Sequence, residues 1–468
     1  MTTMEMDGPR VAFSTLGCRV NYGEAETLGR QFMARGYRVV DFDEQADVYV
    51  VNTCTVTHVA DRKSRGEIRK AARRDPTALV VATGCYVSVA NHGLDGVLPG
   101  NVLIVPNGRK DDLVAIVERE RQARGSCTTL ALETDAPEPV AAVAATRTAR
   151  GSSLPVPLAT VTTRAPLPLR AGATPAALGR TRANLKVQDG CNAGCSFCII
   201  PRARGGPRSV PLDEVVAAAR RLEDWGYREI VVSGVLLGSY GRDLPDAPHL
   251  YDLLAAMLEG TRDVRIRLSS VEPQDVDRDL FTLWRDPRLC RHLHLPLQSG
   301  STTILRAMRR PYDAEWYAAL VRDAVTAIPG LAVTIDLMVG FPGEDECLFD
   351  ESYKLAEGLP LAGIHVFPYS PRRGTAAARF EGQVGDEEKG RRARALRDLS
   401  ARHAERFRRE ERDSVGHVLW EETKSETRDG LTDNYLRVYA DAATTTANTI
   451  TRVRLGHLYA DGFRATPL

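Results

Sequence analysis

Leu185-Lys-Val-Gln-Asp-Gly190 leads directly into Cys191-Asn-Ala-Gly-Cys195-Ser-Phe-Cys198, so a short apolar run is followed at once by three closely spaced cysteines. Seven fully extended residue steps span about 23 Å, and the segment must therefore coil if its three sulfur atoms are to meet at one site. Gly190 and Gly194 permit such coiling, because glycine adopts backbone conformations that are closed to other residues. The stretch predicts a loop that gathers three thiolates immediately after a strand.

Three thiolates on one loop are typical of a particular kind of iron–sulfur site. Electron-transfer clusters use four cysteines, whereas three thiolates on a 4Fe-4S cluster leave one iron free to bind a substrate. Structural zinc is the alternative, but such a site normally closes its tetrahedron with a fourth Cys or His. None lies nearby in the sequence. We therefore expect Cys191, Cys195 and Cys198 to ligate a 4Fe-4S cluster.

Strands alternate with helical stretches from Asn184 onward. The strand candidates are Leu185–Val187, Glu229–Ser233, Val264–Leu268, His292–Leu295, Val333–Leu337 and Ile364–Phe367. This alternation predicts an α/β architecture with a parallel barrel or partial (β/α)6 barrel. Chemistry in such a barrel is expected at the carboxyl ends of the strands, where the cysteine loop begins.

The first part of the chain pairs strands with cysteines a second time. Apolar, β-branched runs end in cysteine at Val11–Cys18, Val48–Cys54 and Leu79–Cys85, and helical patterns cover Glu24–Arg35 and Val59–Arg73. The cysteine intervals of 36 and 31 residues fit one strand–helix–strand unit of roughly 30 or more residues. Ligands collect beyond the carboxyl ends of the strands in an open parallel sheet. We expect such a sheet here, with the three thiols at one site.

Composition sets the broad class of the protein. The 468 residues suggest about three domains, and no apolar run approaches the roughly 20 residues of a membrane-spanning helix. Met1–Arg10 lacks the features of a secretory signal, so we expect a cytoplasmic location and no membrane partner. Nine cysteines, an odd number, argue against a disulfide framework. A net charge of +1 leaves RNA binding to a local basic surface.

Composition also divides the chain into four parts, with boundaries expected at 1–126, 127–182, 183–412 and 413–468. Residues 139–182 are rich in Ala, Pro, Thr and Gly and carry six arginines without Asp or Glu, which is typical of a flexible linker. A basic helix is predicted over Lys389–Asp413, where a solvated face and RNA contact are both open interpretations. The short strands that follow predict a small β-barrel. They are Gly416–Trp420, Tyr435–Tyr439 and Thr449–Leu455.

The motif Cys191, Cys195 and Cys198, with Phe197 before the last cysteine, resembles the radical S-adenosylmethionine superfamily. Its surroundings resemble one branch, the methylthiotransferases. The resemblance covers nearly the whole chain except the linker. Its further motifs are Gly17–Asn21, Asn52–Cys54, Ser233–Gly241, Leu268–Pro273, His294–Gly300, Gly340–Glu344 and Phe367–Arg372.

The resemblance implies two 4Fe-4S clusters and S-adenosylmethionine as cofactors. The cluster on the compact loop would bind S-adenosylmethionine at its open iron and, with an electron from an external donor such as a flavodoxin or ferredoxin, yield a 5′-deoxyadenosyl radical. An auxiliary cluster on Cys18, Cys54 and Cys85 would hold the sulfur to be transferred. The resemblance does not identify the donor of that sulfur. A second S-adenosylmethionine would supply the methyl group. The barrel then orients chemistry that belongs to the cofactors.

Other polar residues fall at the ends of the predicted barrel strands, where cofactor contacts are expected. Those assigned to S-adenosylmethionine, with structural roles as the equal alternative, are Ser233, Gly234, Ser269, Glu272 and Gln298. Of His292 and His294, we expect at most one to face the barrel interior, as a satisfied polar residue. The remaining cysteines, Cys127, Cys290 and Cys347, match no ligand spacing and are expected to be bystanders.

The substrate expectation comes from three segments near the start. Gly17–Asn21, Asn52–Thr57 and Ala60–Arg65 resemble the branch that modifies N6-threonylcarbamoyladenosine in tRNA, and the terminal β segment resembles the RNA-binding TRAM domain. This implies methylthio transfer to C2 of that nucleoside at tRNA position 37, next to the anticodon. Methylthiotransferases acting on isopentenyladenosine or on a ribosomal-protein aspartate are the alternatives within the family. An iron–sulfur electron carrier and an RNA-binding protein with structural metal are the alternatives outside it.

Overall fold

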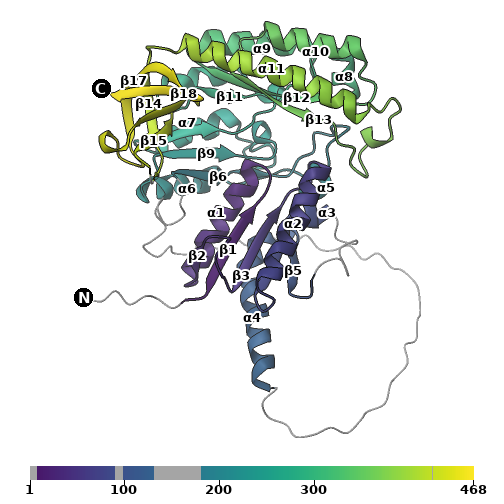
Figure 1. The fold of residues 1–468 in the computed structure, drawn as a ribbon, viewed down its shortest axis with the longest axis vertical. Coiled ribbons are helices and arrows are strands. Elements are labelled where there is room, and N and C mark those ends of the chain that lie inside the picture. The colour runs from purple at the N-terminus through teal and green to yellow at the C-terminus, as the bar shows by residue number, and fades with distance from the viewer. Residues whose placement is uncertain (1–7, 90–98, 131–180, 424) are drawn as a thin grey trace.

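The computed structural model describes residues 8–89, 99–130, 181–423 and 425–468. Over 125–130 it describes the backbone alone. An N-terminal sheet domain lies below a larger barrel domain, and a small β-barrel sits at one end of the latter (Figure 1). Most of the predicted linker, 127–182, falls outside the described residues. Among the helices that are described, none combines the length and apolar character that crossing a membrane requires.

The N-terminal sheet is parallel throughout, in the order β2-β1-β3-β4-β5. Its strands are β1 (Arg10–Thr15), β2 (Arg38–Val40), β3 (Val48–Thr53), β4 (Leu79–Gly84) and β5 (Val102–Val105). The central strands β3 and β4 are buried along their whole length, because parallel sheets are covered on both faces. The three predicted cysteine-bearing strands are confirmed, and β2 and β5 extend the sheet on either side.

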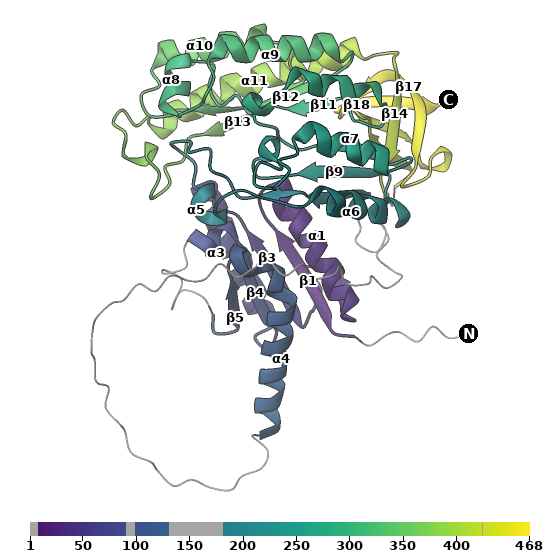
Figure 2. The same cartoon turned by 180° about the vertical axis from the view of Figure 1, so that it is seen from behind.

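Helices cover both faces of this sheet. They are α1 (Arg19–Ala34), α2 (His58–Arg74), α3 (Cys85–Val89) and α4 (Leu113–Leu130). Ile68 and Ala71 of α2 pack on one face, around Tyr49. Phe32 of α1 and Leu113 of α4 pack on the other, the side seen in Figure 2. The predicted open parallel sheet is therefore confirmed, and the structure adds that helices cover both of its faces.

The six predicted barrel strands are confirmed and lie in sequence order. They are β6 (Arg182–Lys186), β9 (Glu229–Ser233), β10 (Arg265–Leu268), β11 (His292–His294), β12 (Ala332–Val339) and β13 (Gly363–Pro368). They form the parallel sheets β6-β9-β10 and β11-β12-β13, which parallel bridges join at Ile266–Leu289 and Ser270–His294. The result is an open partial barrel.

Helices pack around the outside of the barrel (Figures 1 and 2). They are α6 (Leu212–Asp224), α7 (Leu250–Gly260), α8 (Thr302–Ala307), α9 (Ala314–Ala327), α10 (Glu346–Gly358) and α11 (Asp386–Glu410), the last being the predicted basic helix. Shorter elements are β7 (Gln188–Asp189), α5 (Ile200–Arg204), β8 (Arg208–Ser209), and the 3-10 turns η1 (Asn107–Asp112), η3 (Leu237–Ser239), η4 (Pro273–Asp275), η5 (Arg278–Arg285), η6 (Ala377–Arg379) and η7 (Ala442–Thr444).

The expectation that at most one of two strand histidines faces the barrel interior is wrong. His292 Nε2 lies 3.1 Å and His294 Nδ1 2.8 Å from the same hydroxyl, Thr334 Oγ1. Both rings are buried. They point to the same side because residues two apart on a strand share a face.

The C-terminal segment forms the predicted small barrel, closed in the order β14-β15-β16-β18-β17. Its strands are β14 (Val415–Trp420), β15 (Thr427–Leu431), β16 (Arg437–Asp441), β17 (Ile450–Tyr459) and β18 (Gly462–Pro467). Trp420, Val438 and Phe463 are fully buried at its centre. β15 and β18 were not predicted and complete the closure.

Buried charge fixes this small barrel to the amino-terminal end of the large one. The Glu229 carboxylate, which is fully buried, receives the guanidinium groups of Arg265 and Arg267 at 2.6 and 2.7 Å. Arg267 also donates to the carbonyls of Thr432 and Asp433 at 3.0 and 2.7 Å. Because Glu229 and Arg265 begin their strands, the opposite, carboxyl end of the barrel is left for chemistry.

Replacement of Arg267 should therefore destabilise the whole protein. We expect Arg267→Ala to lower the free energy of unfolding by about 3–5 kcal/mol, since it removes one cation from a fully buried carboxylate and the donor of two carbonyls in the small barrel. The matched control is Arg278→Ala, which removes an exposed pair with Asp323 and should cost about 0–1 kcal/mol. Chemical denaturation measures both, and equal small losses would show that the buried pair does not anchor the small barrel.

Candidate metal centres

The compact cysteine loop lies between β7 and α5 and is held by its own backbone. Cys191 N donates to Gly205 O at 3.0 Å, and Cys198 N donates to Cys195 O at 3.2 Å. Gly190 has a φ of 74°, and a Cβ there would lie 1.9 Å from Gly206 O. Glycine is therefore required at 190, and the turn it makes aims the loop beyond the strand end.

The three thiols of this loop form one electrostatic group. Burial, together with the neighbouring Cys195 and Cys191, raises the pKa of Cys198 to about 12. The pKa of Cys191 is also raised, chiefly by burial and also by Cys195. Such thiols ionise readily only when a cation compensates them, and a coordinating metal does so outright. The donor set therefore fits an iron–sulfur cluster.

Arg310 ties the cysteine loop to the barrel wall. Its guanidinium lies 3.4 Å from Cys195 Sγ, forms an ion pair with Glu272, and donates to Tyr312 Oη at 2.9 Å. The side chain is almost fully buried. A fixed positive charge thus lies beside the thiols, where it stabilises a thiolate-bound cluster.

The residues assigned to S-adenosylmethionine all follow strands at the carboxyl end of the barrel. Ser233 ends β9 and Gly234 follows it, Ser269 and Glu272 follow β10, and Gln298 follows β11. Among them, Glu272 is linked to the cysteines by way of Arg310, with which it forms an ion pair. Burial raises the pKa of Glu272, and the Ser269 hydroxyl is buried without a hydrogen-bond partner among the described residues. Their role in binding this cofactor stays a prediction.

The second cysteine trio meets at the carboxyl ends of β1, β3 and β4. Cys18 caps α1, Cys54 follows β3, and Cys85 opens α3. Gly17, at a φ of 99°, lets this corner close, because a Cβ there would lie 3.0 Å from Cys54 Sγ. Burial, together with Cys85 and Cys18, raises the pKa of Cys54 to about 11. The structure thus places the three thiols at neighbouring strand ends, close enough to act on one another's pKa, and this donor set fits a cluster; that they hold one together stays a prediction.

A buried ion network lies directly behind this second trio. Glu24 Oε2 lies 2.5 Å from Lys110 Nζ, and Glu24 Oε1 lies 2.8 Å from the guanidinium of Arg204. Arg204 also pairs with Asp189 at 2.8 Å and donates to Asn21 Oδ1 at 2.6 Å. Glu24 is buried but its pKa is held well below the usual range, because Lys110, Arg204 and Lys186 outweigh the cost of burial.

This network joins the two cysteine sites. Arg204 lies six residues after Cys198, and Asp189 lies two before Cys191, whereas Glu24 and Lys110 belong to the N-terminal domain. Arg204 lies close enough to Cys18 to oppose the rise of its pKa that burial causes. A further link is Asn107 Nδ2, which lies 3.7 Å from Cys85 Sγ and donates to Ala203 O at 3.0 Å.

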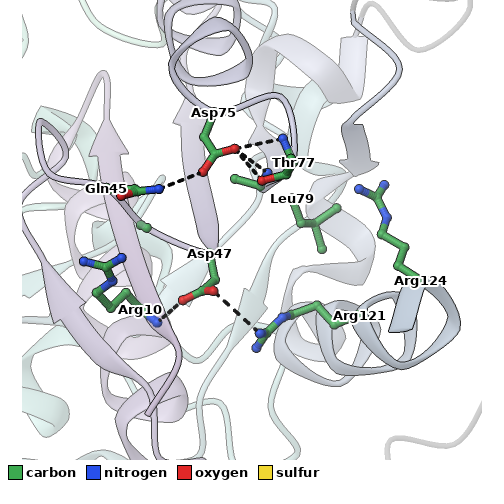
Figure 3. A pocket seen from close by; sticks show the side chains of 10 residues that line it. Arg10, Gln45, Asp47, Asp75, Thr77, Leu79, Arg121 and Arg124 are labelled. Atoms are coloured by element: carbon green, nitrogen blue, oxygen red, sulfur yellow. Dashed lines mark hydrogen bonds and ion pairs between the residues drawn. The ribbon is translucent and has the colours of Figure 1, made fainter. Parts of the chain in front are cut away.

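A separate hollow of about 190 Å³ lies at the other end of the N-terminal sheet (Figure 3). Arg10, Asp47 and Leu79 line it, near the amino ends of β1, β3 and β4. Its polar groups pair among themselves, with Asp47 accepting from the Arg10 backbone N–H at 2.7 Å. The hollow therefore lies away from both cysteine sites.

The sequence interpretation missed the residues that support the cysteines. Glu24, Lys110, Arg204 and Arg310 are charged residues in ordinary helical or loop contexts, and only their burial marks them. Of the presumed bystanders, Cys290 is buried beside Arg267 and Cys347 is exposed on α10. The side chain of Cys127 lies outside the described residues.

Two family models match the chain. The Radical SAM superfamily matches residues 185–356, and the Uncharacterized protein family UPF0004 matches residues 10–105. The first covers the cysteine loop and most of the large barrel, and the second covers the strands that carry the other trio.

Similar proteins of known name align over most of the chain. The threonylcarbamoyladenosine tRNA methylthiotransferase MtaB of Bacillus subtilis (strain 168) is 38% identical over 97% of this chain and 95% of its own. Its namesake in Aquifex aeolicus (strain VF5) is 35% identical over 85% and 89%. The tRNA-2-methylthio-N(6)-dimethylallyladenosine synthase of Dehalococcoides mccartyi (strain CBDB1) is 33% identical over 82% and 81%.

A solved structure shares the fold alone. The radical S-adenosylmethionine methyltransferase TsrM from Kitasatospora setae, with cobalamin and a 4Fe-4S cluster bound, superposes with a TM-score of 0.54 at 16% identity. The match covers 79% of this chain and 74% of that one.

The lowered pKa of Glu24 predicts a specific acid sensitivity. Its stabilising effect is fully present above the unfolded-state pKa of about 4.3 and is lost as pH falls toward the lower folded-state value. Glu24→Gln should cost about 3 kcal/mol or more at pH 7 and should flatten this acid limb. Urea unfolding from pH 7 to pH 3 measures it, with Glu118→Gln, at a partly exposed pair with Arg35, as the control. An unchanged acid limb in Glu24→Gln would contradict the assignment.

Proposed function

Because this chain belongs to the tRNA methylthiotransferases of the radical SAM superfamily, we propose that it attaches a methylthio group to C2 of N6-threonylcarbamoyladenosine at position 37 of tRNA. The Bacillus subtilis relative that aligns over 97% of this chain carries the threonylcarbamoyladenosine name. The observation that carries the proposal is the joining of two three-cysteine sites through one buried ion network.

Each trio would hold one 4Fe-4S cluster. Cys191, Cys195 and Cys198 would ligate the cluster that binds S-adenosylmethionine, and the N-terminal trio would ligate the auxiliary cluster. When bound, these groups and S-adenosylmethionine supply the adenosyl radical and the methylthio group. An external reductant such as a flavodoxin or ferredoxin would deliver the electron.

The protein's own residues orient these groups. Arg310 holds a positive charge against Cys195 and turns Glu272 toward the same space. Gly234 lets the backbone after β9 pack closely against Gln188, since a Cβ there would lie 3.0 Å from Gln188 Oε1. Ser233, Ser269, Glu272 and Gln298 would then bind S-adenosylmethionine at the carboxyl end of the barrel, away from the docked terminal barrel.

The terminal barrel supplies a surface suited to RNA. Tyr459 is exposed and lies 5.2 Å from Tyr439 between ring centroids, with the guanidinium of Arg464 5.7 Å from its ring. Aromatic and cationic side chains on a small β-barrel are the usual platform for nucleic-acid bases. This supports tRNA as the partner and therefore a cytoplasmic site of action.

Other functions have less support. An electron carrier needs four protein ligands for each cluster and no barrel of this size. A binding protein with structural metal does not account for the match to the radical SAM superfamily. Action on dimethylallyladenosine is the nearest rival, since a relative of that name is 33% identical.

The first test addresses the loop cysteines. Anaerobically reconstituted enzyme with reductant, S-adenosylmethionine and threonylcarbamoyladenosine-containing tRNA should yield the 2-methylthio nucleoside, measured by mass spectrometry. Cys191→Ala, Cys195→Ala or Cys198→Ala should abolish 5′-deoxyadenosine formation as well as product, because each removes a ligand of the radical-forming cluster. Cys347→Ala is the matched control and should change neither. Persistent cleavage in any loop variant would refute this assignment.

The second test separates the two clusters. Replacing Cys18, Cys54 or Cys85 by Ala should roughly halve the iron content, consistent with loss of one cysteine-ligated cluster. Reductive formation of 5′-deoxyadenosine should survive, while the methylthio nucleoside disappears. A triple variant that still makes the methylthio product would rule out the auxiliary cluster as the sulfur source.

A further inference from the structure

A histidine–aspartate–histidine cluster lies inside the large barrel, apart from both cysteine trios. Asp336 Oδ1 lies 3.1 Å from His294 Nε2 and 3.5 Å from His365 Nδ1. The two rings are stacked, with centroids 5.0 Å apart. Although burial raises the pKa of Asp336, hydrogen bonds from both histidines bring it to about 2. An ionised carboxylate therefore fixes two imidazole rings.

The cluster faces the inside of the barrel. Along β12, Val333, Ile335 and Leu337 are buried, while the alternate positions, among them Asp336, are partly open. Asp336 is paired in register with His365 on β13. The His365 side chain is 59% exposed, so its ring lines open space while His294 lies buried behind it.

This position lies between the two cysteine sites. On one side, Asp336 lies close enough to Glu272 for its charge to raise the pKa of that carboxyl. Glu272 in turn pairs with Arg310 beside Cys195. On the other side, β13 runs into a loop where Arg372 donates to Thr55 Oγ1 at 2.7 Å, the residue after Cys54. The inner face of β13 is therefore connected to both cysteine sites.

We propose that His365, oriented by Asp336, binds the carboxylate of the threonylcarbamoyl substituent and thereby selects this nucleoside over one bearing an uncharged N6 group. The inference rests on the proposed function and deepens it. In the imidazolium form, His365 Nδ1 donates to Asp336 and leaves Nε2 to donate to the substrate.

The chemistry of the substituents favours this role. A threonylcarbamoyl group carries a carboxylate and a hydroxyl, whereas a dimethylallyl group is wholly apolar and would gain nothing from a charged histidine. A hydrogen bond from a charged donor to a carboxylate is stronger than one between neutral groups. His294 already meets Thr334 and Asp336, so His365 is the member of the pair that is free to reach a ligand.

The test compares anticodon stem-loop RNAs that differ only at position 37, carrying threonylcarbamoyladenosine, dimethylallyladenosine or adenosine. Binding is measured anaerobically with the reconstituted holoenzyme. We expect His365→Ala to lower the preference for the threonylcarbamoyl RNA over the adenosine RNA by about tenfold or more, as for loss of one charge-assisted hydrogen bond. His365→Gln, which keeps a donor without charge, should lose less.

Phe367→Ala is the matched control, because Phe367 lies two residues further along β13, is also exposed, and carries no charge. It should alter affinity for all three RNAs by the same factor and leave the preference intact. An unchanged preference in His365→Ala would overturn the inference. The inference would also be overturned if the unsubstituted enzyme held about one equivalent of a metal other than iron and His365→Ala lost it. The histidine–aspartate–histidine cluster would then be a metal site.

The proposed function fails in a distinguishable way. If it is wrong, the unsubstituted enzyme itself shows no preference for the threonylcarbamoyl RNA and forms no methylthio product from it. If only the inference is wrong, the unsubstituted enzyme prefers the threonylcarbamoyl RNA and forms the methylthio product. His365→Ala then prefers that RNA to the same degree.

Discussion

The architecture depends on one buried carboxylate, Glu24, and the cations that surround it. Burying a charge is costly unless partners compensate it, and here Lys110, Lys186 and Arg204 lie within 3.2 Å of its oxygens. With Asp189 included, the network holds three cations and two carboxylates. The excess positive charge lies beside Cys18, where thiolates of a bound cluster would balance it. A cluster bound there and the ion network would therefore stabilise each other.

Further polar contacts make the orientation of the two domains specific. Glu26 on α1 accepts hydrogen bonds from the backbone and side-chain N–H groups of Asn184 on β6, at 2.9 and 2.7 Å. On the opposite side of the interface, Arg372 forms an ion pair with Asp61 at 2.6 Å. Hydrogen bonds are more directional than apolar packing. Contacts at both edges thus hold the carboxyl ends of the two sheets toward one another.

The sequence allowed the central strands and both cysteine trios to be predicted, because apolar runs and cysteine spacing are local signals. It did not reveal the edge strand β2, whose three residues, Arg38–Val40, carry too short a pattern. It could not reveal the Glu24–Arg204 pair either, since these residues lie 180 positions apart and neither differs locally from a solvated charge. The His292 and His294 prediction failed for another reason. It placed two residues on opposite faces of a strand although residues two apart share a face.

The position of the terminal barrel determines how its role in RNA binding can be examined. Arg265 and Arg267 donate to carbonyls of Leu431, Thr432 and Asp433, so removing residues 413–468 would leave buried guanidinium groups without those acceptors. Lost tRNA affinity in such a truncation would then mix misfolding with a missing surface. The exposed ring of Tyr459 instead contacts Tyr439 and Arg464. Changes confined to these outward side chains isolate the RNA surface, because the anchor at Glu229 is then left intact.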